Sequence, residues 1–445
     1  MNGTVGEISG VTREFCARMA GVRPGDLPAK AMHEGRRGVL DWLGCALAGS
    51  RHPTLDVLLA VLQEAGGRPQ ATVFGRGLKL GLLDAPIANG QAGHVLDYDD
   101  THMGGTVLHT SSPTLAALFS LAERGRAAGA EFLLAYAVGF EAGVRTGQAA
   151  PGHHKGGWHL TGTLGSIAAG VAAGKLLGLD YAMSIAATQA AGMQQNRGTM
   201  CKSFHAGKAA SSGVLAALLA ERGFDGSLEI IEGRRGYCRI YSDVAAPEAL
   251  IDELGARWEI TRNGHKPYAC GVVLHPVIDA VIEIRSKANI DPARVQSIEL
   301  RVHPLVISIT GVEEPATGLQ SKFSVYHSAA VALIDGAARI PQYTDQRAGD
   351  PAVIALRRKV KVTADESLGK DQAEAVVVAD GTRHRAVIGH ATGTAGNPMS
   401  DAALEAKFMA NAVPVIGEDR AQRVRDSVWN LDRLGDVREL IRLCA

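Results

Sequence analysis

The chain has 445 residues, of which 46% are hydrophobic and 21% charged, a balance typical of folded globular proteins and not of disordered or fibrous ones. Because this length exceeds the usual size of one hydrophobic core, we expect two domains of unequal size. The 46 basic residues equal the 46 acidic ones, so no net charge attracts nucleic acid or anionic lipid, and nucleic-acid binding is disfavoured.

The N-terminal residues 1–10 contain neither a basic leader nor an apolar segment, so we expect no secretory signal and a cytoplasmic protein. Apolar stretches such as Ser166–Leu179 are interrupted by Lys175 and are shorter than the roughly 20 residues that span a bilayer, so no membrane insertion is expected. The six cysteines are scattered without CxxC pairs, as is typical of reduced, mostly buried thiols and not of a disulfide framework or zinc site.

The first half of the chain, from Glu14 to about Gly223, has apolar residues at helical spacing and few alternating runs, which predicts an all-helical region. One segment of it repeats small residues at spacings that allow helices to approach closely, namely Gly162, Gly165, Ala169, Ala173 and Gly174. Because glycine lowers helix propensity, such a helix depends on tertiary packing. We therefore expect it at the centre of a buried bundle.

The densest polar cluster runs from His94 to His102 and is followed by His109 in a Ser/Thr-rich turn. It contains Asp97, Asp99 and Asp100. Carboxylates and imidazoles are ordinary ligands of a divalent metal, but an aspartate that orients a histidine also forms a metal-free acid/base network. A helix end capped by aspartates, with exposed histidines, is the third interpretation, and the spacing alone leaves all three open.

Two more clusters follow in the helical region. His159, within Gly156–Gly162, comes directly before the small-residue segment, where free N–H groups at a helix start favour anions. A core or capping histidine is an equally simple interpretation. Lys202 and His205 lie with a second lysine on a glycine-flanked turn, an arrangement that would suit a carboxylate clamp.

The composition changes near Trp258, and a fourth cluster, His265–Gly271, lies at this change. Its Lys266 would be partly desolvated at a domain junction, which lowers a lysine pKa and suits proton transfer. A solvated linker charge is the more common case. The loop Gly75–Gly77 lacks the third glycine of a dinucleotide loop, and no phosphate-binding GxxxxGK[ST] or nucleophile-elbow GxSxG motif appears, so we expect no nucleotide cofactor.

Alternating apolar residues then predict strands at Ile298–Val302, at Val360–Val362 and over Ala375–Val387, the last with the two-residue hairpin turn Asp380-Gly381. We expect these strands to be antiparallel. His275–Arg285 and Phe323–Gly336 are predicted amphipathic helices, so the second unit is α+β. Tyr326 and His327 on the later helix would complete a pocket, although a tyrosine on an amphipathic face is more often part of the core.

The break at Asn397-Pro398 precedes Ser400, which can cap a new helix, and the tail returns to helical spacing. The predicted fold is mostly α: a large all-helical domain with a central helix bundle built from both ends of the chain, plus a smaller inserted α+β lid domain. The predicted boundaries are 1–266 and 400–445 for the helical domain and 267–399 for the lid.

Taken together, seven segments in this order resemble the MmgE/PrpD family over the chain from about Arg13 to the C-terminal helix. The block from Ala88-Asn89-Gly90 through Leu96–His102 is the most specific match. The others are Asp41–Gly49, Gly157–His159, Lys202–Gly207, Lys266–His275, Phe323-Ser324 through Asp335-Gly336, and Asn397-Pro398 through Phe408.

The resemblance implies a homodimeric enzyme without cofactor or metal, with its active site in a cleft between the domains and a small anionic di- or tricarboxylate as substrate. It implies acid/base and substrate-binding roles for Asp97, His109, His159, Lys202 and Lys266. It also implies, more weakly, substrate-binding roles for five other side chains: Tyr98, His102, His205, Tyr326 and His327.

Known activities in the family include 2-methylcitrate dehydration, cis-aconitate decarboxylation and iminodisuccinate epimerisation. The dehydratase and decarboxylase branches resemble one another in an aromatic-Pro-Ala segment with a nearby histidine or glutamate, whereas this chain has Tyr268-Ala269-Cys270-Gly271. The chain therefore looks most like the iminodisuccinate epimerase branch, whose reaction needs a base on one face of the substrate carbon and an acid on the other. The alternatives are a dehydratase-like or decarboxylase-like lyase, a metal-dependent hydrolase built on the aspartate cluster, and a non-catalytic binding protein.

Overall fold

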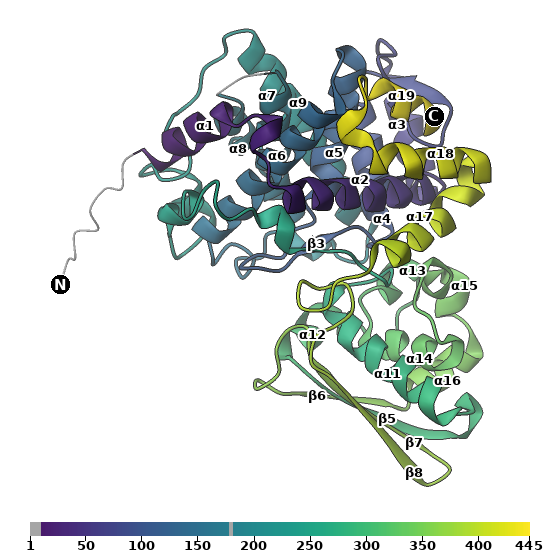
Figure 1. Ribbon diagram of the computed structural model, residues 1–445. Helices are drawn as coiled ribbons and strands as arrows, with labels where there is room; N and C mark the ends of the chain where they lie inside the picture. The colour runs from purple at the N-terminus through teal and green to yellow at the C-terminus, as the bar shows by residue number, and fades with distance from the viewer. Residues whose placement is uncertain (1–9, 178–180) are drawn as a thin grey trace, which may run out of the picture.

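A computed structural model describes residues 10–177 and 181–445 (Figure 1). Helices dominate the first half of the chain and return at its C-terminal end, which confirms the mostly α class. They are α1 (Val11–Gly21), α2 (Ala29–Gly49), α3 (Pro53–Ala65), α4 (Ala85–Val95), α5 (Ser111–Arg124), α6 (Gly129–Ala149), α7 (Leu160–Leu177), α8 (Ala182–Ala187), α9 (Met200–Glu221), α10 (Tyr237–Tyr241), α17 (Asp401–Ile416), α18 (Glu418–Trp429) and α19 (Arg438–Leu443).

Helix α7 is the central helix of the bundle, as predicted, and it packs against α5, α6, α8 and α9. Its small residues allow this approach: a Cβ atom on Gly162 would lie 2.3 Å from the carbonyl oxygen of Ala191, and one on Gly170 would lie 2.4 Å from Cβ of Ala186. By length and composition α7 could cross a membrane, but 78% of its apolar window is buried inside the protein. The helix is thus accounted for as the core of the bundle.

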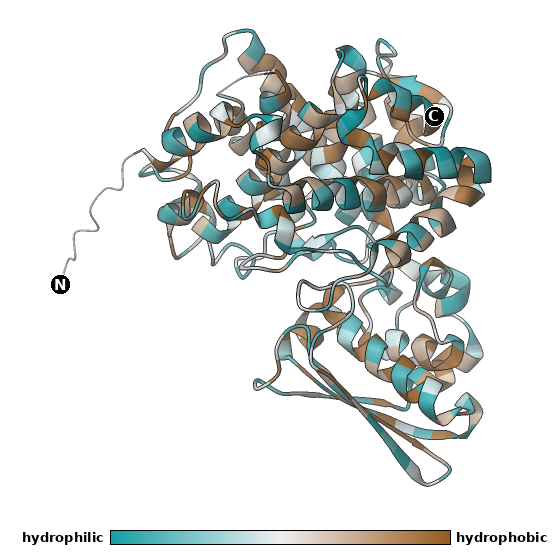
Figure 2. Ribbon diagram, viewed as in Figure 1, coloured by the Kyte–Doolittle hydropathy of each residue, from teal (hydrophilic) through white to brown (hydrophobic). Residues whose placement is uncertain are grey.

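Three further contacts place the segments that matter for the site. Helix α4 packs against both α9 and α2, and α17 from the C-terminal end packs along α2. A Cβ atom on Gly207 in α9 would lie 2.2 Å from the carbonyl oxygen of Ile87 in α4, so these two backbones touch. In Figure 2 the exposed C-terminal helix α18 is mostly hydrophilic, while the buried helices carry more of the hydrophobic residues.

Two short strand pairs interrupt the helical region. Strands β1 (Ala71–Val73) and β2 (Leu78–Leu80) form an antiparallel pair, and β3 (Thr101–His102) pairs with β4 (Asn263–Gly264). The prediction of an all-helical stretch is therefore wrong in these segments, because runs of two or three residues are too short to show an alternating pattern. The pairing of β3 with β4 brings the aspartate-rich segment beside the segment of Lys266.

The second part of the chain contains a four-stranded sheet in the order β6-β5-β7-β8. Its strands are β5 (Val295–Val302), β6 (Val360–Ala364), β7 (Ala373–Ala379) and β8 (Thr382–Ile388). The predicted hairpin is confirmed: Ala379 pairs with Thr382, and Asp380 and Gly381 both have positive φ, as a two-residue turn requires. The prediction of antiparallel pairing throughout is wrong for β5 and β6, which are parallel because five helices intervene and return the chain to the same end of the sheet.

The helices of this part are α11 (His275–Ala288), α12 (Pro304–Thr310), α13 (Gly318–Ser321), α14 (Val325–Asp335), α15 (Asp345–Ala348) and α16 (Pro351–Arg357). The helices predicted at His275–Arg285 and Phe323–Gly336 are thus confirmed as α11 and α14. Helix α11 packs on β7 and β8, and α14 packs on α11 and α16. Figure 1 shows the sheet and these helices below the bundle, with α17 leading back into it.

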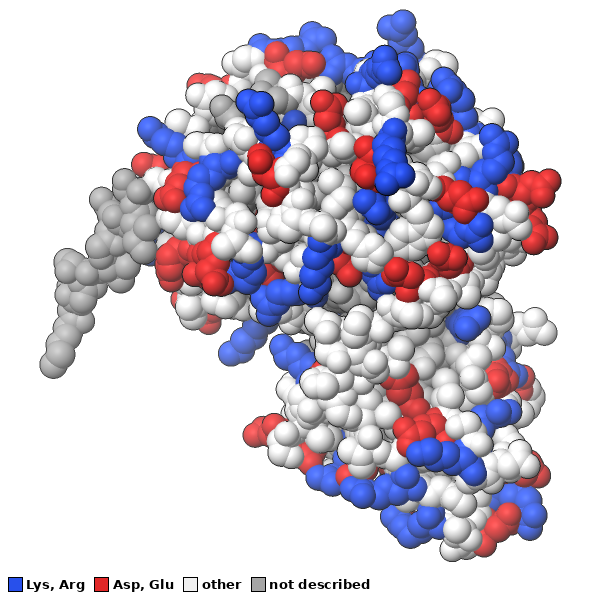
Figure 3. Space-filling view, in the orientation of Figure 1, with Lys and Arg blue, Asp and Glu red and all other residues white. Residues whose placement is uncertain are grey.

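Ser400 caps α17, as predicted, by accepting a hydrogen bond from the Ala403 N–H at 3.2 Å. The division at 266/267 and 399/400 into two domains stays a prediction. On the face drawn in Figure 3, basic and acidic residues are interspersed over both parts of the molecule. This mixture accords with the zero formal net charge of the sequence.

Candidate active site

The turn after α4 carries Asp97, whose φ of 50° lies in the left-handed region that aspartate tolerates better than most residues. Its N–H donates to the carbonyl of His94 at 3.0 Å. Its buried carboxylate accepts hydrogen bonds from Lys202 Nζ at 2.6 Å and from Lys266 Nζ. Lys202 belongs to the first turn of α9 and Lys266 follows β4, so three separate segments meet at one carboxylate.

A third buried lysine lies nearby. Lys322 Nζ donates to the carbonyls of Leu96 at 2.7 Å and Ala269 at 2.8 Å, and burial lowers its pKa to about 8. Burial also lowers the Lys202 pKa. Burial alone would raise the Asp97 pKa, but Lys202 and Lys266 outweigh it and hold that pKa well below its usual range. Two lysines thus share the Asp97 carboxylate and a third lies close by on backbone carbonyls, an accumulation of positive charge that suits an anionic ligand.

Four imidazoles form a chain beside the lysines. The ring centroid of His94 lies 4.8 Å from that of His109 and 5.6 Å from that of His159, and His159 lies 5.1 Å from His205. The Nδ1 atoms of His159 and His205 are 2.9 Å apart. Burial lowers the pKa of all four, to about 4 for His205, so these rings are neutral at neutral pH.

The aspartates fix the orientation of two of these rings. His94 Nδ1 lies 2.9 Å from Asp99 Oδ2, which also accepts from Ser112 Oγ at 2.7 Å. His109 Nδ1 donates to the carbonyl of Asp100 at 2.7 Å. In a neutral imidazole only one nitrogen carries the proton, so Nε2 of His109 has a free lone pair and can act as a base.

Burial and hydrogen bonding distinguish the three interpretations of the polar cluster from His94 to His109. Exposed histidines at a helix end are excluded, because His94, Asp99 and His109 are all buried. Their ligand atoms lie within 4.8 Å of one another, close enough to hold a metal ion. However, the oxygens of Asp99 are already hydrogen-bonded, and Lys202 opposes positive charge on His94. The hydrogen-bonded acid/base network accounts for the Asp99 oxygens and for Nδ1 of both histidines, while the buried His94 Nε2 has no hydrogen-bond partner. Independence of a metal stays a prediction.

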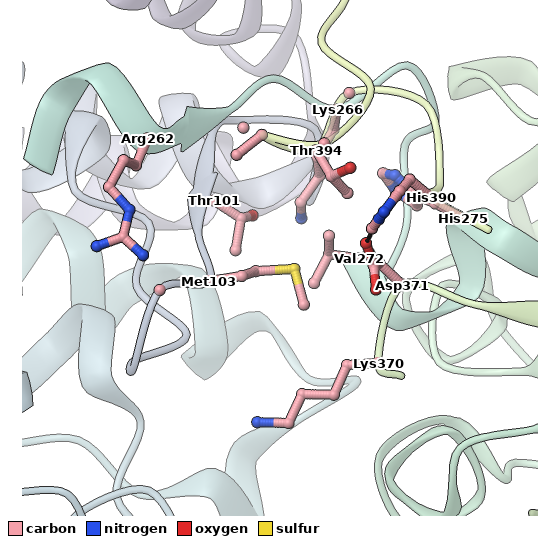
Figure 4. A pocket seen from close by; sticks show the side chains of 15 residues that line it. Thr101, Met103, Arg262, Lys266, Val272, His275, Lys370, Asp371, His390 and Thr394 are labelled. Atoms are coloured by element: carbon pink, nitrogen blue, oxygen red, sulfur yellow. Dashed lines mark hydrogen bonds and ion pairs between the residues drawn. The ribbon is translucent and has the colours of Figure 1, made fainter. Parts of the chain in front are cut away.

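Two cavities reach the cluster. One of about 10 Å³, enough for a single water molecule at most, touches Asp97, Lys202 and Lys322. The other, of about 350 Å³, is lined by Thr101, Arg262, Lys266, His275, Lys370 and His390, among others (Figure 4). Lys266 connects the two, since it lines the large cavity and its ammonium group bonds to Asp97.

The structure thus brings together the five residues to which the resemblance gives the main roles, Asp97, His109, His159, Lys202 and Lys266, together with His205. It places Tyr98 and His102 elsewhere. Tyr98 donates to the carbonyl of Pro267 at 3.0 Å, and its ring lies 3.9 Å from Lys407 Nζ. His102 Nε2 lies 3.1 Å from the buried carboxylate of Glu259. The hydrogen-bond partners of both side chains thus lie outside the group of Lys202, Lys266 and Lys322. A role for Tyr98 or His102 in substrate binding stays a prediction.

Tyr326 and His327, both on α14, also lie outside the cluster. Tyr326 is half-buried, and neither of the two cavities touches it. His327 is fully buried; its Nε2 donates to the carbonyl of Gln342 at 2.8 Å, and burial lowers its pKa to about 4. A histidine in this setting stabilises the packing of α14. A role for either residue in substrate binding stays a prediction.

Sequence reasoning did not assign roles to His94, Lys322, His275 or His390. His94 was part of the polar cluster and lies three residues before Asp97, a spacing that places both at one helix end. Lys322 directly precedes the Phe323-Ser324 segment of the resemblance. His275 ends the Lys266–His275 segment of the resemblance. His390 had no such signal, because its place in a cavity depends on how distant segments fold together.

Comparison with known proteins gives matches over most of the chain. The model of the MmgE/PrpD N-terminal domain matches residues 13–249, and that of the MmgE/PrpD C-terminal domain matches residues 268–433. The chain is 29% identical to a cis-aconitate decarboxylase of Aspergillus terreus, over 98% of this chain and 96% of the relative. It is 27% and 26% identical to the cis-aconitate decarboxylases of Mus musculus and Homo sapiens, over 98% of this chain and 93% and 95% of theirs.

Proposed function

Since this chain belongs to the MmgE/PrpD family, we propose that it is a lyase that acts on a small polycarboxylate by acid/base chemistry, with cis-aconitate as the first substrate to test. The observation that carries the proposal is the cluster of three lysines beside four histidines: Lys202 and Lys266 bond to the Asp97 carboxylate, and the buried Lys322 bonds to the neighbouring Leu96 carbonyl. The full-length relatives that are named cis-aconitate decarboxylase support the choice of a lyase over an isomerase.

The proposed reaction divides the work between the two kinds of side chain. In a decarboxylation the C–C bond to one carboxylate breaks, CO₂ leaves, and the electron pair remains on the substrate until a proton is delivered to carbon. Lys202 and Lys266 would bind the carboxylates and stabilise the developing negative charge. His109 or His159 would carry the proton, which is replaced from solvent. Asp97 would hold the two ammonium groups in place.

A second candidate is the epimerase, for which one observation speaks. The segment after Lys266 offers no free acid or base: the Tyr268 hydroxyl donates to Asp279, and burial raises the pKa of the Cys270 thiol to about 12. An epimerase needs no leaving group to be protonated there, only removal and return of one proton beside a carboxylate. Iminodisuccinate is the substrate that this candidate predicts.

Proton NMR in heavy water separates these candidates in one experiment. The purified protein is incubated in turn with cis-aconitate, 2-methylcitrate and resolved stereoisomers of iminodisuccinate. Loss of CO₂ with deuterium bound to carbon identifies the decarboxylase, and loss of water identifies a dehydratase. Inversion of the stereocentre with deuterium bound to that carbon, and with no loss of CO₂ or water, identifies the epimerase. If none of the three compounds changes, the proposed function is wrong.

The same assay tests whether the reaction needs a metal. We expect prolonged dialysis against EDTA to leave turnover unchanged, because the site residues already form hydrogen bonds and ion pairs among themselves. Activity that disappears and returns only when a divalent ion is added would instead favour a metal-dependent hydrolase that uses His94, Asp99 and His109 as ligands.

A further inference from the structure

The large cavity brings a side chain of the second part of the chain close to the segment of Lys266. Its walls come from the turn at Thr101, from the segment of Arg262 to Lys266, and from two later stretches at 370–371 and 390–396 (Figure 4). The later stretches flank β7 and β8. A ligand in this cavity would therefore touch both the bundle and the sheet-containing part.

His390 and Asp371 form a hydrogen-bonded dyad on this wall. Asp371 Oδ2 lies 2.7 Å from His390 Nδ1, and the main chain adds a bond from the Ala391 N–H to the Asp371 carbonyl at 2.9 Å. The pairing of Nδ1 with a carboxylate leaves Nε2 as the nitrogen that can exchange a proton with a ligand. The His390 side chain is 58% exposed, so it can also exchange protons with solvent.

The loop that holds His390 is packed tightly against the segment of Lys266. A Cβ atom on Gly393 would lie 2.0 Å from the carbonyl oxygen of His265, and one on Gly396 would lie 2.9 Å from the His390 ring. Within the loop, the Gly393 N–H donates to the Asn397 carbonyl at 2.8 Å. These close backbone contacts hold the loop against the segment of His265 and Lys266. The tertiary fold therefore fixes the position of the His390 imidazole.

No other titratable side chain among the described residues on these walls combines solvent exposure with a nitrogen that can exchange a proton with a ligand. His275, the other imidazole among the described residues that line the cavity, is 1% exposed, and burial lowers its pKa to about 3. Lys266 is committed to Asp97, and Arg262 donates to Glu259 at 3.2 Å. Lys370 forms no ion pair within the described part of the chain, and in Figure 4 its ammonium group points away from His390.

We propose that His390, oriented by Asp371, is a proton-transfer residue that the second part of the chain contributes to the polycarboxylate site. This inference rests on the proposed function. In the forward step the Nε2–H bond of the imidazolium breaks and a C–H bond forms at the substrate carbon, whose electron pair is released by the departing CO₂ or by loss of a proton to His109 or His159. In the decarboxylation His390 thus takes the proton-delivering role for which His109 and His159 are the other candidates. The neutral imidazole then takes a proton from solvent. Asp371 is a positioning residue that stabilises the imidazolium.

The test that does not depend on turnover is histidine-ring NMR on the full-length protein. Propane-1,2,3-tricarboxylate, a saturated tricarboxylate, serves as the probe, and the His390 resonances are assigned by their absence in His390→Gln. We expect the probe to shift the His390 ring resonances while those of His384, on β8 and outside the cavity lining, stay in place. Asp371→Asn should change the distribution of the proton between Nδ1 and Nε2 in the free protein. A His390 ring that does not respond to millimolar probe overturns the proposal.

The second test measures the turnover of variants on whichever of the three substrates the wild-type protein accepts. We expect His390→Gln to lower kcat by about 10²-fold, the usual scale for a positioned acid or base, with a smaller change in KM. His384→Gln is the matched control and should retain wild-type rates. A His390→Gln variant with wild-type kcat refutes the inference and leaves the proposed function standing. A wild type that binds the probe at His390 but turns over none of the three substrates refutes the proposed function instead.

Discussion

Lys202 is one of two lysines that neutralise a single carboxylate, and its ammonium group borders the small cavity at Asp97. Because this charge would bind and stabilise an anionic substrate, we expect Lys202→Met to lower kcat/KM by about 10²-fold or more. Lys208→Met is the matched control, since Lys208 lies on the same helix and is exposed. Steady-state kinetics on both variants check the prediction, and equal losses in the two would contradict it.

Lys322 gives the site a pH dependence with a defined sign. Burial lowers its pKa to about 8, so the ammonium group is charged below that pH and loses its charge as pH rises through it. If the charge contributes to substrate binding, kcat/KM falls above pH 8. We expect Lys322→Met to lower kcat/KM at pH 7 and to remove this alkaline limb. A pH profile whose alkaline limb is the same in both proteins would show that another group causes it.

The contact between α4 and α9 positions the site at the scale of whole elements. Helix α9 carries Lys202, the turn after α4 carries Asp97, and Gly207 is where the two backbones touch. A Cβ atom there would lie 2.2 Å from the carbonyl oxygen of Ile87, which must move. We therefore expect Gly207→Ala to lower the free energy of unfolding by about 1–3 kcal/mol, the usual cost of overpacking.

The same variant should also reduce activity, because separating the helices lengthens the bond between Lys202 and Asp97. Gly21→Ala, at the end of α1 where a Cβ atom would have no neighbour within 4 Å, is the control. Urea unfolding and steady-state kinetics measure both effects. A stable and fully active Gly207→Ala protein would mean that the helices adjust without disturbing the site.

At the scale of the whole molecule, buried histidines predict how stability depends on pH. Burial lowers the pKa to about 4 for His154, His205 and His327 and to about 3 for His153 and His275. An unfolded histidine has a pKa near 6.5. As pH falls below that value the unfolded chain binds protons that the folded chain does not, so the free energy of unfolding decreases toward pH 4.

Four groups act in the opposite direction. Burial raises the pKa of Glu141 to about 7 and also raises the pKa of Asp279. The carboxylates of Asp41 and Glu34 outweigh burial and raise the pKa of His265. Asp100 is the fourth group. Burial, with the neighbouring charge of Asp99, raises the Asp100 pKa to about 6, so between about pH 6 and 4 the folded state binds this proton more tightly than the unfolded state. These four groups do not offset the ten described histidines whose pKa burial lowers. We expect the urea midpoint to fall steadily from pH 6.5 to 4 at constant ionic strength. A midpoint that is level or rises over this interval would contradict the prediction.

The sequence by itself determined the features that depend on local pattern. Helical spacing predicted the bundle, alternating residues predicted the strands, and Asp380-Gly381 predicted the hairpin, because each of these signals lies within a few neighbouring residues. The order of its motifs also identified the family and six residues of one cluster. The cytoplasmic location, the homodimer and the domain boundaries stay predictions.

Only the tertiary structure decided which side chains meet. Parallel pairing of β5 with β6, the structural contacts of Tyr98 and His102, and the placement of Lys322 and His390 all depend on segments that are far apart in the chain. Short motifs do not encode such contacts, since the side chains that surround a residue are supplied by the whole fold. For the same reason burial, which sets whether a lysine or histidine is charged, could be known only once the chain was folded.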